Sequence, residues 1–258
     1  MNKIFLLTNI KNDQDGEDNF LTSLLKKRFD VKLIDINKTK NIGKFNLLLI
    51  RNIWPVKKYN LKRILKKKFK LYNDLYSGSG DIRGKDYLVD LYKLGYKVIP
   101  TTKNIKELNT LPKSEKYIIK PINGGSSLGI KILNKDDLIK ENPKNYIIQP
   151  LLKIKKEISF YFIDKKLQYT LYTSKDRWDL KYYKPNKYEI NLANQFSNWN
   201  KLKYGIQRID MCKTGDNSML LMEIEDFCPF LSLKDINYKL RNKFLKNLIK
   251  SLQKAIIQ

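Results

Sequence analysis

The sequence predicts an α/β (α+β) protein in which a small parallel unit precedes a strand-rich remainder. Short apolar runs alternate with segments of helical spacing in the first third of the chain, and predicted strands dominate from about residue 98 onward. The chain also has 258 residues, of which 42% are hydrophobic, and this is enough to bury a sizeable core. These observations indicate a folded protein despite a 30% content of charged residues.

The N-terminal part of the chain alternates between strand and helix patterns. The apolar run at residues 4–7 predicts a first strand, and the runs at 31–36 and 45–50 predict two more. Between the first two runs, apolar residues recur at helical spacing, namely Phe20, Leu21, Leu24, Leu25 and Phe29. Because strands that alternate with helices are typical of parallel sheets, we assign residues 1–76 to one α/β domain.

A joint rich in glycine and serine at residues 77–80 separates this domain from the rest of the chain. A helix is predicted to begin near Lys85 and to stop at Gly95, because glycine suits a helix C-terminus. Strands are then predicted at 97–100, 117–120, 129–133, 146–149, 157–163, 167–173, 205–212 and 219–225, before a closing amphipathic helix over 240–256. We divide this part into two further units, residues 77–147 and residues 148–258.

The composition excludes several classes of chemistry. The chain contains no histidine, which excludes Ser-His-Asp triads, Cys-His pairs and histidine-ligated zinc. Its two cysteines, Cys212 and Cys228, are too few for a structural zinc site and favour a reduced, cytoplasmic protein. No stretch approaches the ~20 apolar residues of a membrane span, and the first apolar run is too short for a signal peptide. We therefore expect no membrane partner.

The formal net charge of +26 admits two interpretations. Such a charge is typical of proteins that bind nucleic acid, anionic membranes or acidic substrates. The excess is nevertheless almost all lysine and is spread along the chain, whereas arginine, which can contact guanine and phosphate bidentately, is scarce. The densest run, residues 62–70, keeps apolar residues at helical spacing. We therefore interpret that run as the solvated face of an amphipathic helix rather than a nucleic-acid contact.

Residues 205–225 contain the most informative pattern, two apolar-rich strands around a turn-forming segment. Because side chains alternate between the faces of a strand, Arg208 shares a face with Asp210, and Glu223 shares a face with Glu225. A hairpin register places Asp210 opposite or diagonal to Glu223, where like charges repel. A bound Mg²⁺ or Mn²⁺ would compensate the three carboxylates. The alternative is a solvated sheet face on which lysines pair with these acids.

A second pattern is a strand that ends in Lys120 and Pro121 and leads into a loop rich in glycine and serine. Backbone N–H groups of glycines can converge on an anion, hydroxyls add donors, and the lysine adds a charge suited to phosphate. The candidate contacts from this loop are Gly124, Gly125, Ser126, Ser127 and Gly129. The loop lacks the Gly-Lys-Ser/Thr of a Walker A motif, and the same composition is common in plain hairpin turns.

Taken together and in this order, the patterns resemble the ATP-grasp superfamily of carboxylate–amine ligases. D-alanine–D-alanine ligases carry a similar Lys-Pro…Gly-Ser-Ser-x-Gly stretch, followed by an Arg-x-Asp strand and a Glu-x-Asn strand. The helix that begins at Lys85, before residues 98–101, looks like the family's K-x-x-L…(V/I)-P-T stretch. Residues 146–152 are similar to the family's strand whose backbone meets adenine. The strand end at residues 50–54 resembles small glutathione-synthetase-like members.

This resemblance implies an ATP-grasp fold, with a Rossmann-like pre-ATP-grasp domain and two α+β subdomains that sandwich ATP. It also implies ATP and Mg²⁺ (or Mn²⁺) as cofactors. The implied reaction forms an amide or peptide bond through an acyl phosphate and releases ADP and phosphate. The implied nucleotide contacts, besides the glycine-rich loop, are Lys85, Lys120, Gln149, Leu151, Leu152 and Glu157. The implied metal ligands are Asp210, Glu223 and Glu225.

Lys120 and Arg208 are the catalytic candidates that the resemblance implies. Lys120 would neutralise phosphate charge, and Arg208 would stabilise the charge that develops on the acyl phosphate. The alternative role of Arg208 is a salt bridge that holds Asp210 in place. The sequence departs from the family at Gln149, which replaces a frequent Glu, and at Glu225, where many members have Asn. One extra residue also separates Gln149 from Glu157.

The substrates that the resemblance implies are a small-molecule or peptide carboxylate and an amine. Arg51, Lys175 and Arg177 are candidates for binding the carboxylate, although each also fits a plain surface charge. Two alternatives to a ligase stay open: a basic nucleic-acid-binding protein on a degenerate ATP-grasp scaffold, and an ATP-grasp kinase. We do not expect nucleic acid as the main partner, and the oligomeric state stays open between a monomer and a homodimer.

Overall fold

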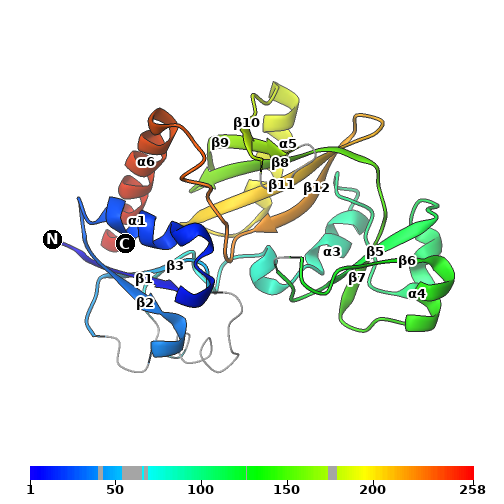
Figure 1. The fold of residues 1–258 in the computed structure, drawn as a ribbon, viewed down its shortest axis with the longest axis horizontal. Coiled ribbons are helices and arrows are strands. Elements are labelled where there is room, and N and C mark those ends of the chain that lie inside the picture. Colours follow the sequence, from blue (N-terminus) through cyan, green and yellow to red (C-terminus); the bar gives the residue numbers. More distant parts are fainter. Residues whose placement is uncertain (40–42, 54–65, 67–68, 126, 174–178) are drawn as a thin grey trace.

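The computed structural model describes the chain except for residues 40–42, 54–65, 67–68, 126 and 174–178. Three β-sheets follow one another along the chain, and helices pack against each of them (Figure 1). The predicted mixture of α and β structure is thus confirmed. Most of the lysine-rich helix predicted at residues 62–70 lies outside the described residues.

The first sheet contains β1 (Lys3–Thr8), β2 (Asp30–Asp35), β3 (Leu47–Ile50) and β4 (Leu71–Tyr72) in the order β2-β1-β3-β4. All of its strand pairs are parallel, as the alternation of strands and helices predicted. Helix α1 (Glu17–Leu25) joins β1 to β2, and the short 3-10 segments η1 (Ile10–Asn12), η2 (Gln14–Gly16) and η3 (Ile36–Lys38) flank these elements. Strand β4 has only two residues, which is too short to be recognised from a pattern.

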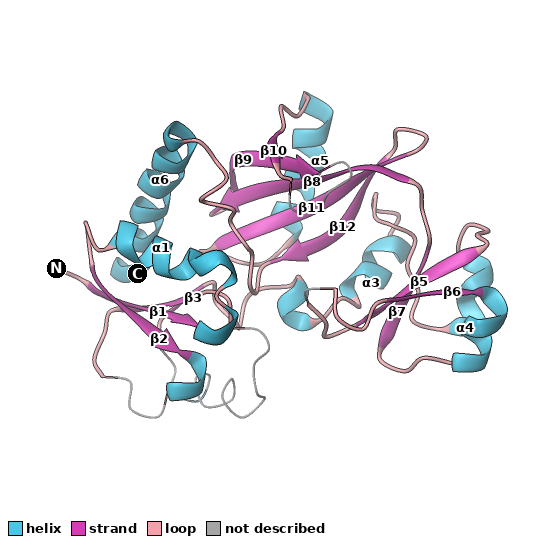
Figure 2. Cartoon of the chain, viewed as in Figure 1, coloured by secondary structure: helices cyan, strands magenta, loops and turns pink. Residues whose placement is uncertain are grey.

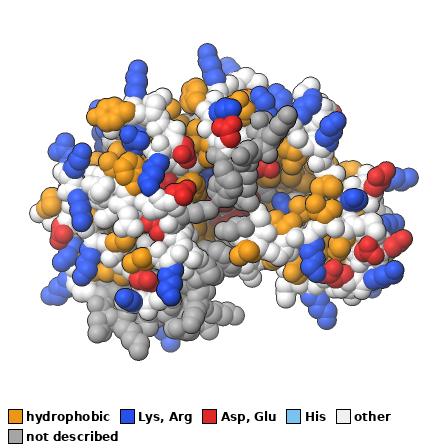
Figure 3. Space-filling model, viewed as in Figure 1, with side chains coloured by type: hydrophobic (Ala, Val, Ile, Leu, Met, Phe, Trp, Pro, Cys, Tyr) orange, Lys and Arg blue, Asp and Glu red, His pale blue; other side chains and the backbone are white. Residues whose placement is uncertain are grey.

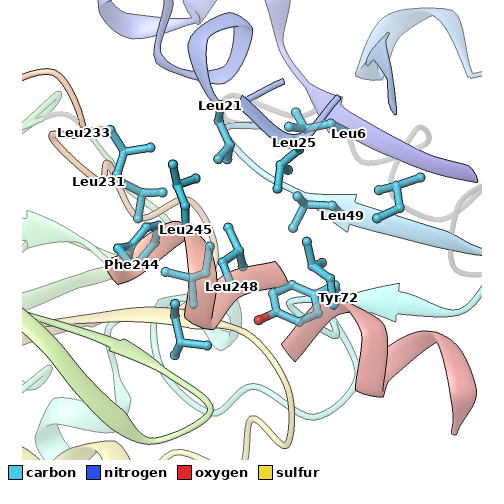
Figure 4. Close-up of a cluster of buried hydrophobic side chains, with 14 of the residues drawn as sticks. Leu6, Leu21, Leu25, Leu49, Tyr72, Leu231, Leu233, Phe244, Leu245 and Leu248 are labelled. Carbon is cyan, nitrogen blue, oxygen red and sulfur yellow. The ribbon is translucent and has the colours of Figure 1, made fainter. Parts of the chain in front are cut away.

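The closing helix α6 (Tyr238–Ile257) packs in one core with the N-terminal unit and with Tyr161 and Tyr169 of the third sheet. Asn237 caps its first turn by accepting a hydrogen bond from the N–H of Leu240 at 2.9 Å. Its apolar face meets α1 and β1, and Figure 4 shows Leu245 and Leu248 turned towards Leu21 and Leu25. Each fully buried leucine contributes roughly 1.5–3 kcal/mol, so this contact fastens the end of the chain to its beginning.

The second sheet contains β5 (Lys116–Pro121), β6 (Lys131–Asn134) and β7 (Tyr146–Pro150) in the antiparallel order β6-β5-β7. Helix α4 (Lys135–Glu141) and the 3-10 segment η5 (Ile105–Thr110) complete its core. The predicted strand at 129–133 begins later, because Gly129 has a φ of +77°, which a strand does not allow. The prediction of a strand at 97–100 was wrong, since Val98 forms only an isolated bridge to Leu221.

The third sheet is antiparallel and has the order β10-β9-β8-β11-β12. Its strands are β8 (Ile154–Ile163), β9 (Lys166–Thr173), β10 (Lys181–Tyr182), β11 (Ile206–Thr214) and β12 (Met219–Glu225). Helices α3 (Tyr87–Lys93) and α5 (Lys187–Trp199) share a core with this sheet. In Figure 2, α3 lies between the second and third sheets, preceded by the 3-10 segment η4 (Asp81–Arg83). The sequence patterns did not predict α4 or α5.

The sheets follow the proposed division of the chain only in part. The first sheet lies within residues 1–76 and the third within 148–258, but β7 crosses the boundary between 147 and 148. Helix α6 also packs in the core of the first sheet, so the N-terminal unit includes the end of the chain. The domain limits therefore stay a proposal. Within the residues that the structure describes, no helix combines the length and the apolar character that crossing a lipid bilayer requires.

A buried group of charges joins the first sheet to the segment that follows β12. Arg51 is 2% exposed and donates to Asp18 at 2.8 Å and to Glu17 at 3.0 Å. Its remaining guanidinium contact is the carbonyl oxygen of Pro229, at 2.8 Å. Glu17 in turn accepts hydrogen bonds from the backbone N–H groups of residues 231 and 233. This burial contradicts the expectation that Arg51 binds a substrate carboxylate, because its guanidinium is enclosed by structural partners.

We predict that Arg51→Met destabilises the protein by about 3–5 kcal/mol, because it leaves two buried carboxylates without their cation. Chemical denaturation followed by circular dichroism measures the change. Arg28→Met is the matched control, since Arg28 is exposed and should alter stability by less than about 0.5 kcal/mol. Equal stability of the two variants would contradict the structural role of Arg51.

Candidate functional site

The acidic hairpin forms as its alternation predicted. Strands β11 and β12 pair with Asp210 opposite Glu223 and Arg208 opposite Glu225. The register shifts after Asp210, so that Met222 forms a bulge just before Glu223. One carboxylate oxygen from each of Asp210, Glu223 and Glu225 lies within 4.8 Å of the others. Three acids from two adjacent strands therefore converge on one point of the sheet face.

Two cations compensate these acids. Arg208 donates from Nε to Asp210 Oδ1 at 2.8 Å, and its Nη2 lies 2.7 Å from Asp210 Oδ2 and 2.9 Å from Glu225 Oε1. Lys85, which is only 7% exposed, donates to Glu223 Oε2 at 2.6 Å. Ser159, on the neighbouring strand β8, adds a hydrogen bond to Asp210 at 2.7 Å. The repulsion that the hairpin register creates is thus offset by basic side chains that the fold delivers.

A turn before α3 brings in further groups that the sequence interpretation missed. Asp81 accepts a hydrogen bond from Lys85 Nζ and another, at 3.0 Å, from the hydroxyl of Tyr87. Asp226, directly after Glu225, accepts from the backbone N–H groups of residues 80 and 82. Helix α3 starts at Tyr87 rather than Lys85, and the N–H of Lys85 donates to the carbonyl of residue 122 at 2.8 Å, just after β5. Lys85 is therefore tied by its backbone to the second sheet and by its side chain to the third.

Lys120 ends strand β5 close to the same acids. Burial lowers the pKa of its ammonium group, Glu223 opposes this shift, and the charge of Lys85 adds to it. The glycine-rich loop that follows folds against the same strand end, where a Cβ atom would lie 3.1 Å from Pro121 at Gly124 and 2.9 Å from it at Gly129. Ser127, on the same loop, is exposed and has a φ of 59°. The loop is an open flap beside Lys120, and Ser126 lies outside the described residues.

Strand β7 leads into the segment where the resemblance placed the nucleotide base. Gln149 is fully buried, and its amide nitrogen donates to Thr101 Oγ1 at 2.9 Å. The hydroxyl of Thr101 itself donates to the carbonyl of Ile99, which fixes Thr101 as the acceptor from Gln149. Gln149 Oε1 consequently has no partner in the part of the chain that the structure describes. A buried carbonyl oxygen without a donor costs about 1–3 kcal/mol, so this atom fits a ligand's N–H group.

The other predicted nucleotide residues lie beyond Gln149. Leu151 is exposed and Leu152 is half-buried, both between β7 and β8. Glu157 is exposed on β8 opposite Cys212 of β11. Burial raises the pKa of the Cys212 thiol to about 12, and the charge of Glu157 adds to this shift. Glu157 also opposes the lowering of the Lys120 pKa that burial causes, so its charge acts near both groups. The two remaining substrate candidates, Lys175 and Arg177, lie outside the described residues.

The carboxylates of the cluster differ in their protonation. Burial raises the pKa of Glu223, but Lys85 and Lys120 more than offset this and hold it at about 2. Burial raises the pKa of Glu225 to about 8, against the effect of Arg208 and with that of Asp210. Burial likewise raises the pKa of Asp81 to about 7, although Lys85 opposes the shift. The three acids therefore differ in pKa, with Glu223 the most acidic and Glu225 the least.

The donor set fits a hard divalent cation. Carboxylate oxygens are the ligands that Mg²⁺ and Mn²⁺ prefer, and here three of them converge without nitrogen or sulfur among them. Two buried or half-buried lysines, Lys85 and Lys120, lie next to the same point and suit the phosphates of a nucleotide. The site thus combines carboxylates suited to a metal with lysines suited to an anion.

No family model and no curated protein sequence matches the chain. Solved structures match it over nearly its full length. D-cycloserine synthetase DcsG has a TM-score of 0.74 at 15% identity, over 96% of this chain and 99% of that chain. The D-alanine–D-alanine ligase from Bacillus anthracis has a TM-score of 0.69 at 17% identity, over 99% of each chain.

A third solved structure is the ATP-grasp ligase PsnB, complexed with a phosphomimetic variant of its minimal precursor, Mg and ADP. It has a TM-score of 0.67 at 14% identity, over 98% of this chain and 99% of that chain. The chain therefore has the ATP-grasp fold, as the order of its motifs predicted.

We predict that Mn²⁺ binding to the carboxylate cluster tightens as the pH rises from about 6 to about 8, by up to about tenfold per unit. Glu225 holds a proton below its pKa of about 8, and a metal ligand must be deprotonated, so the metal displaces that proton. Titration calorimetry in two buffers of different ionisation enthalpy measures both affinity and proton release. Glu225→Gln should bind less tightly and lose this pH dependence, whereas an unchanged dependence would contradict the assignment.

We predict that Gly80→Ala weakens ADP binding in the presence of Mg²⁺ by about tenfold. A Cβ atom at this position would lie 2.5 Å from the carbonyl oxygen of Ile224, so the turn that carries Asp81 and leads to Lys85 must move. Gly43→Ala is the control, because nothing lies within 4 Å of a Cβ atom there. Fluorescence of a labelled ADP measures the affinity, and equal affinity in both variants would show that the turn does not shape the site.

Proposed function

We propose that this protein is an ATP-dependent carboxylate–amine ligase, which forms an amide or peptide bond through an acyl phosphate and releases ADP and phosphate. The observation that supports this most directly is the juxtaposition of three converging carboxylates with Lys85 and Lys120 in a full-length ATP-grasp fold. Phosphoryl transfer depends on positioning and charge neutralisation more than on covalent chemistry by the protein. A chain without histidine can therefore perform it.

In this proposal Asp210, Glu223 and Glu225 hold one or two divalent cations. When bound, the metal supplies positive charge that polarises the phosphate oxygens. Lys85 and Lys120 neutralise nucleotide phosphates, and the loop at 124–129 covers them with backbone N–H groups and hydroxyls. None of these residues donates or accepts a proton in the proposed reaction. The charges of their side chains serve only to complement the charges of the metal and the nucleotide.

We place the base of ATP at the exit of β7, beside residues 149–152. The unpartnered Gln149 Oε1 would accept a hydrogen bond from the exocyclic amino group of adenine, which guanine lacks at the same position. Glu157, on the side of Lys120, is the acceptor that we assign to the ribose hydroxyls. These assignments predict a preference for ATP over GTP.

Arg208 takes the role of a salt bridge in the structure, since it donates to Asp210 and Glu225 and, from Nη1, to the carbonyl of Phe230 at 3.1 Å. This supports the interpretation in which Arg208 holds the metal ligands in place. We retain a second role for it, the stabilisation of charge on the transferred phosphoryl group, because it lies at the edge of the same cluster.

The substrates in this proposal are a carboxylate and an amine on small molecules or peptides. PsnB was solved with a variant of its minimal precursor, and DcsG and the D-alanine–D-alanine ligase are named for small products. We keep Lys175 and Arg177 as proposed contacts for the carboxylate and remove Arg51, whose guanidinium is enclosed. A cytoplasmic location and a homodimer stay predictions.

We predict that the wild-type protein releases ADP and phosphate when supplied with ATP, Mg²⁺ and its amino-acid or peptide substrates. Asp210→Asn and Glu223→Gln should lower this rate by at least about a hundredfold, because each removes a metal ligand. Asp136→Asn, on the exposed face of α4, is the matched control with unchanged activity. A panel of amino acids and dipeptides, assayed by coupled ADP release, identifies the substrate.

Hydroxylamine distinguishes the proposed reaction from phosphorylation alone. When the amine substrate is left out, a ligase still forms the acyl phosphate. Hydroxylamine reacts with this acyl phosphate and gives a hydroxamate. A kinase instead yields a stable phosphate ester and no free phosphate. Binding to RNA or DNA that weakens with salt, together with no ATP turnover on any substrate, would favour the nucleic-acid alternative. Equal activity of wild type and both acid variants would remove the proposed site.

A further inference from the structure

We infer that Asp81 is a positioning residue for Lys85, which holds the lysine ammonium beside the site when a divalent cation takes the carboxylate of Glu223. This inference rests on the metal and nucleotide site proposed above, and it adds an exchange of ion pairs to that site. Asp81 belongs to the turn η4, outside the hairpin that supplies the three converging carboxylates.

The ammonium of Lys85 is shared between two acids. It donates to Glu223 Oε2 at 2.6 Å and to Asp81 Oδ2, and so uses two of its three N–H donors. The lysine side chain is 8% exposed, whereas the Asp81 and Glu223 side chains are 15% and 28% exposed. Because so little water reaches the ammonium, it requires a carboxylate partner at all times. Two partners allow one of them to be released.

Asp81 is fastened to the strand that carries the metal ligands. The hydroxyl of Tyr87 donates to Asp81 Oδ1 at 3.0 Å and accepts from the N–H of Ile224 at 2.6 Å. On either side of Asp81, the backbone N–H groups of Gly80 and Ile82 donate to Asp226 at 2.9 and 3.0 Å. Ile224 and Asp226 flank Glu225, so the carboxylate of Asp81 keeps a fixed place relative to the cluster. Glu223 is the more exposed partner and the one that a cation can reach.

The Lys85 ammonium and a divalent cation would compete for the carboxylate of Glu223. A divalent cation bound to the converging oxygens of Asp210, Glu223 and Glu225 would lie beside the Lys85 ammonium, and like charges at that distance repel strongly. Lys85 then gives up Glu223 and stays with Asp81. The N–H donor that Lys85 releases would then be available to a nucleotide phosphate. Because Asp81 holds Lys85 in place, metal binding would increase the affinity for phosphate, and phosphate binding would increase the affinity for the metal.

The test is a double-mutant cycle on Mn²⁺ binding to the full-length protein without nucleotide, measured by electron paramagnetic resonance. The variants are Asp81→Asn, Lys85→Met and the double variant. Without the carboxylate of Asp81, Glu223 is the one acid left to pair with Lys85, and the lysine competes with Mn²⁺ for it. We therefore expect Asp81→Asn to weaken Mn²⁺ binding by at least about tenfold. In the Lys85→Met background, which should itself bind Mn²⁺ more tightly, the same change should cost at most about threefold. Equal factors in the two backgrounds would overturn the inference, since Asp81 would then act only through its own charge.

Nucleotide binding gives a second readout that a loss of fold would not imitate. Asp81→Asn should weaken binding of ADP with Mn²⁺ by about tenfold and leave binding of metal-free ADP unchanged or tighter. A merely structural defect would weaken both. Asp86→Asn is the matched control, because Asp86 is a neighbour in sequence that pairs with Lys103 at 3.6 Å and is 41% exposed. It should change either affinity by less than about twofold. If Lys85→Met does not fold, this comparison alone decides the question.

The outcomes also distinguish this inference from the proposed function. If Mn²⁺ binds to the wild type but Asp81→Asn weakens ADP with and without metal equally, only the inference fails. If neither the wild type nor Lys85→Met binds Mn²⁺, the metal site itself is absent and both fail.

Discussion

The arrangement of the site depends on one electrostatic constraint, the need to compensate acids that a hairpin register forces together. Asp210 and Glu223 lie opposite one another on adjacent strands, and Glu225 follows on the same face. Like charges in such positions destabilise a sheet unless cations meet them. Arg208 supplies one cation from within the hairpin, whereas Lys85 comes from a different unit of the chain. The ion pair between Lys85 and Glu223 therefore also fixes how the segment that carries Lys85 packs against the third sheet.

A second polar network explains why the N-terminal unit packs as it does. Arg51 and Glu17 bond the backbone of residues 229–233, the segment that follows the three converging carboxylates. Arg208 also donates to the carbonyl of Phe230 in this segment, so both networks form hydrogen bonds with the same stretch of chain. Helix α6 then covers the N-terminal sheet with its apolar face. The acidic site and the N-terminal core are consequently joined through residues 229–233. Arg51 is used in this junction, which is why the expectation that it contacts a substrate failed.

Local patterns carried the predictions that succeeded. The pairing of Asp210 with Glu223 follows from the alternation of side chains and a short turn, both of which are local in sequence. Asp81 contacts Lys85 and Tyr87, which are close to it in sequence, but it joins the site only because Lys85 also reaches Glu223 across 138 positions. Asp226 was missed because its bond from Gly80 spans 146 positions. No periodicity records such contacts. Helix α5 did leave a readable signal, the capping box of Asn186 and Glu189, which periodicity alone did not detect. The strand predicted at 97–100 is reduced to a bridge at Val98, beside a proline that cannot donate to a sheet.

The lysine content of the chain and the chemistry of its site are separate questions. Figure 3 shows Lys and Arg side chains scattered over the whole visible face with acids between them, rather than gathered in one patch. Lys85 and Lys120 differ from these residues by their burial and by the acids that perturb them. An exposed lysine shares its charge with water and salt, so its effect on a ligand is weak. Lys85 is held by Asp81 and Glu223 together, and in our inference the bond to Asp81 is the one that persists when its charge becomes available to a phosphate.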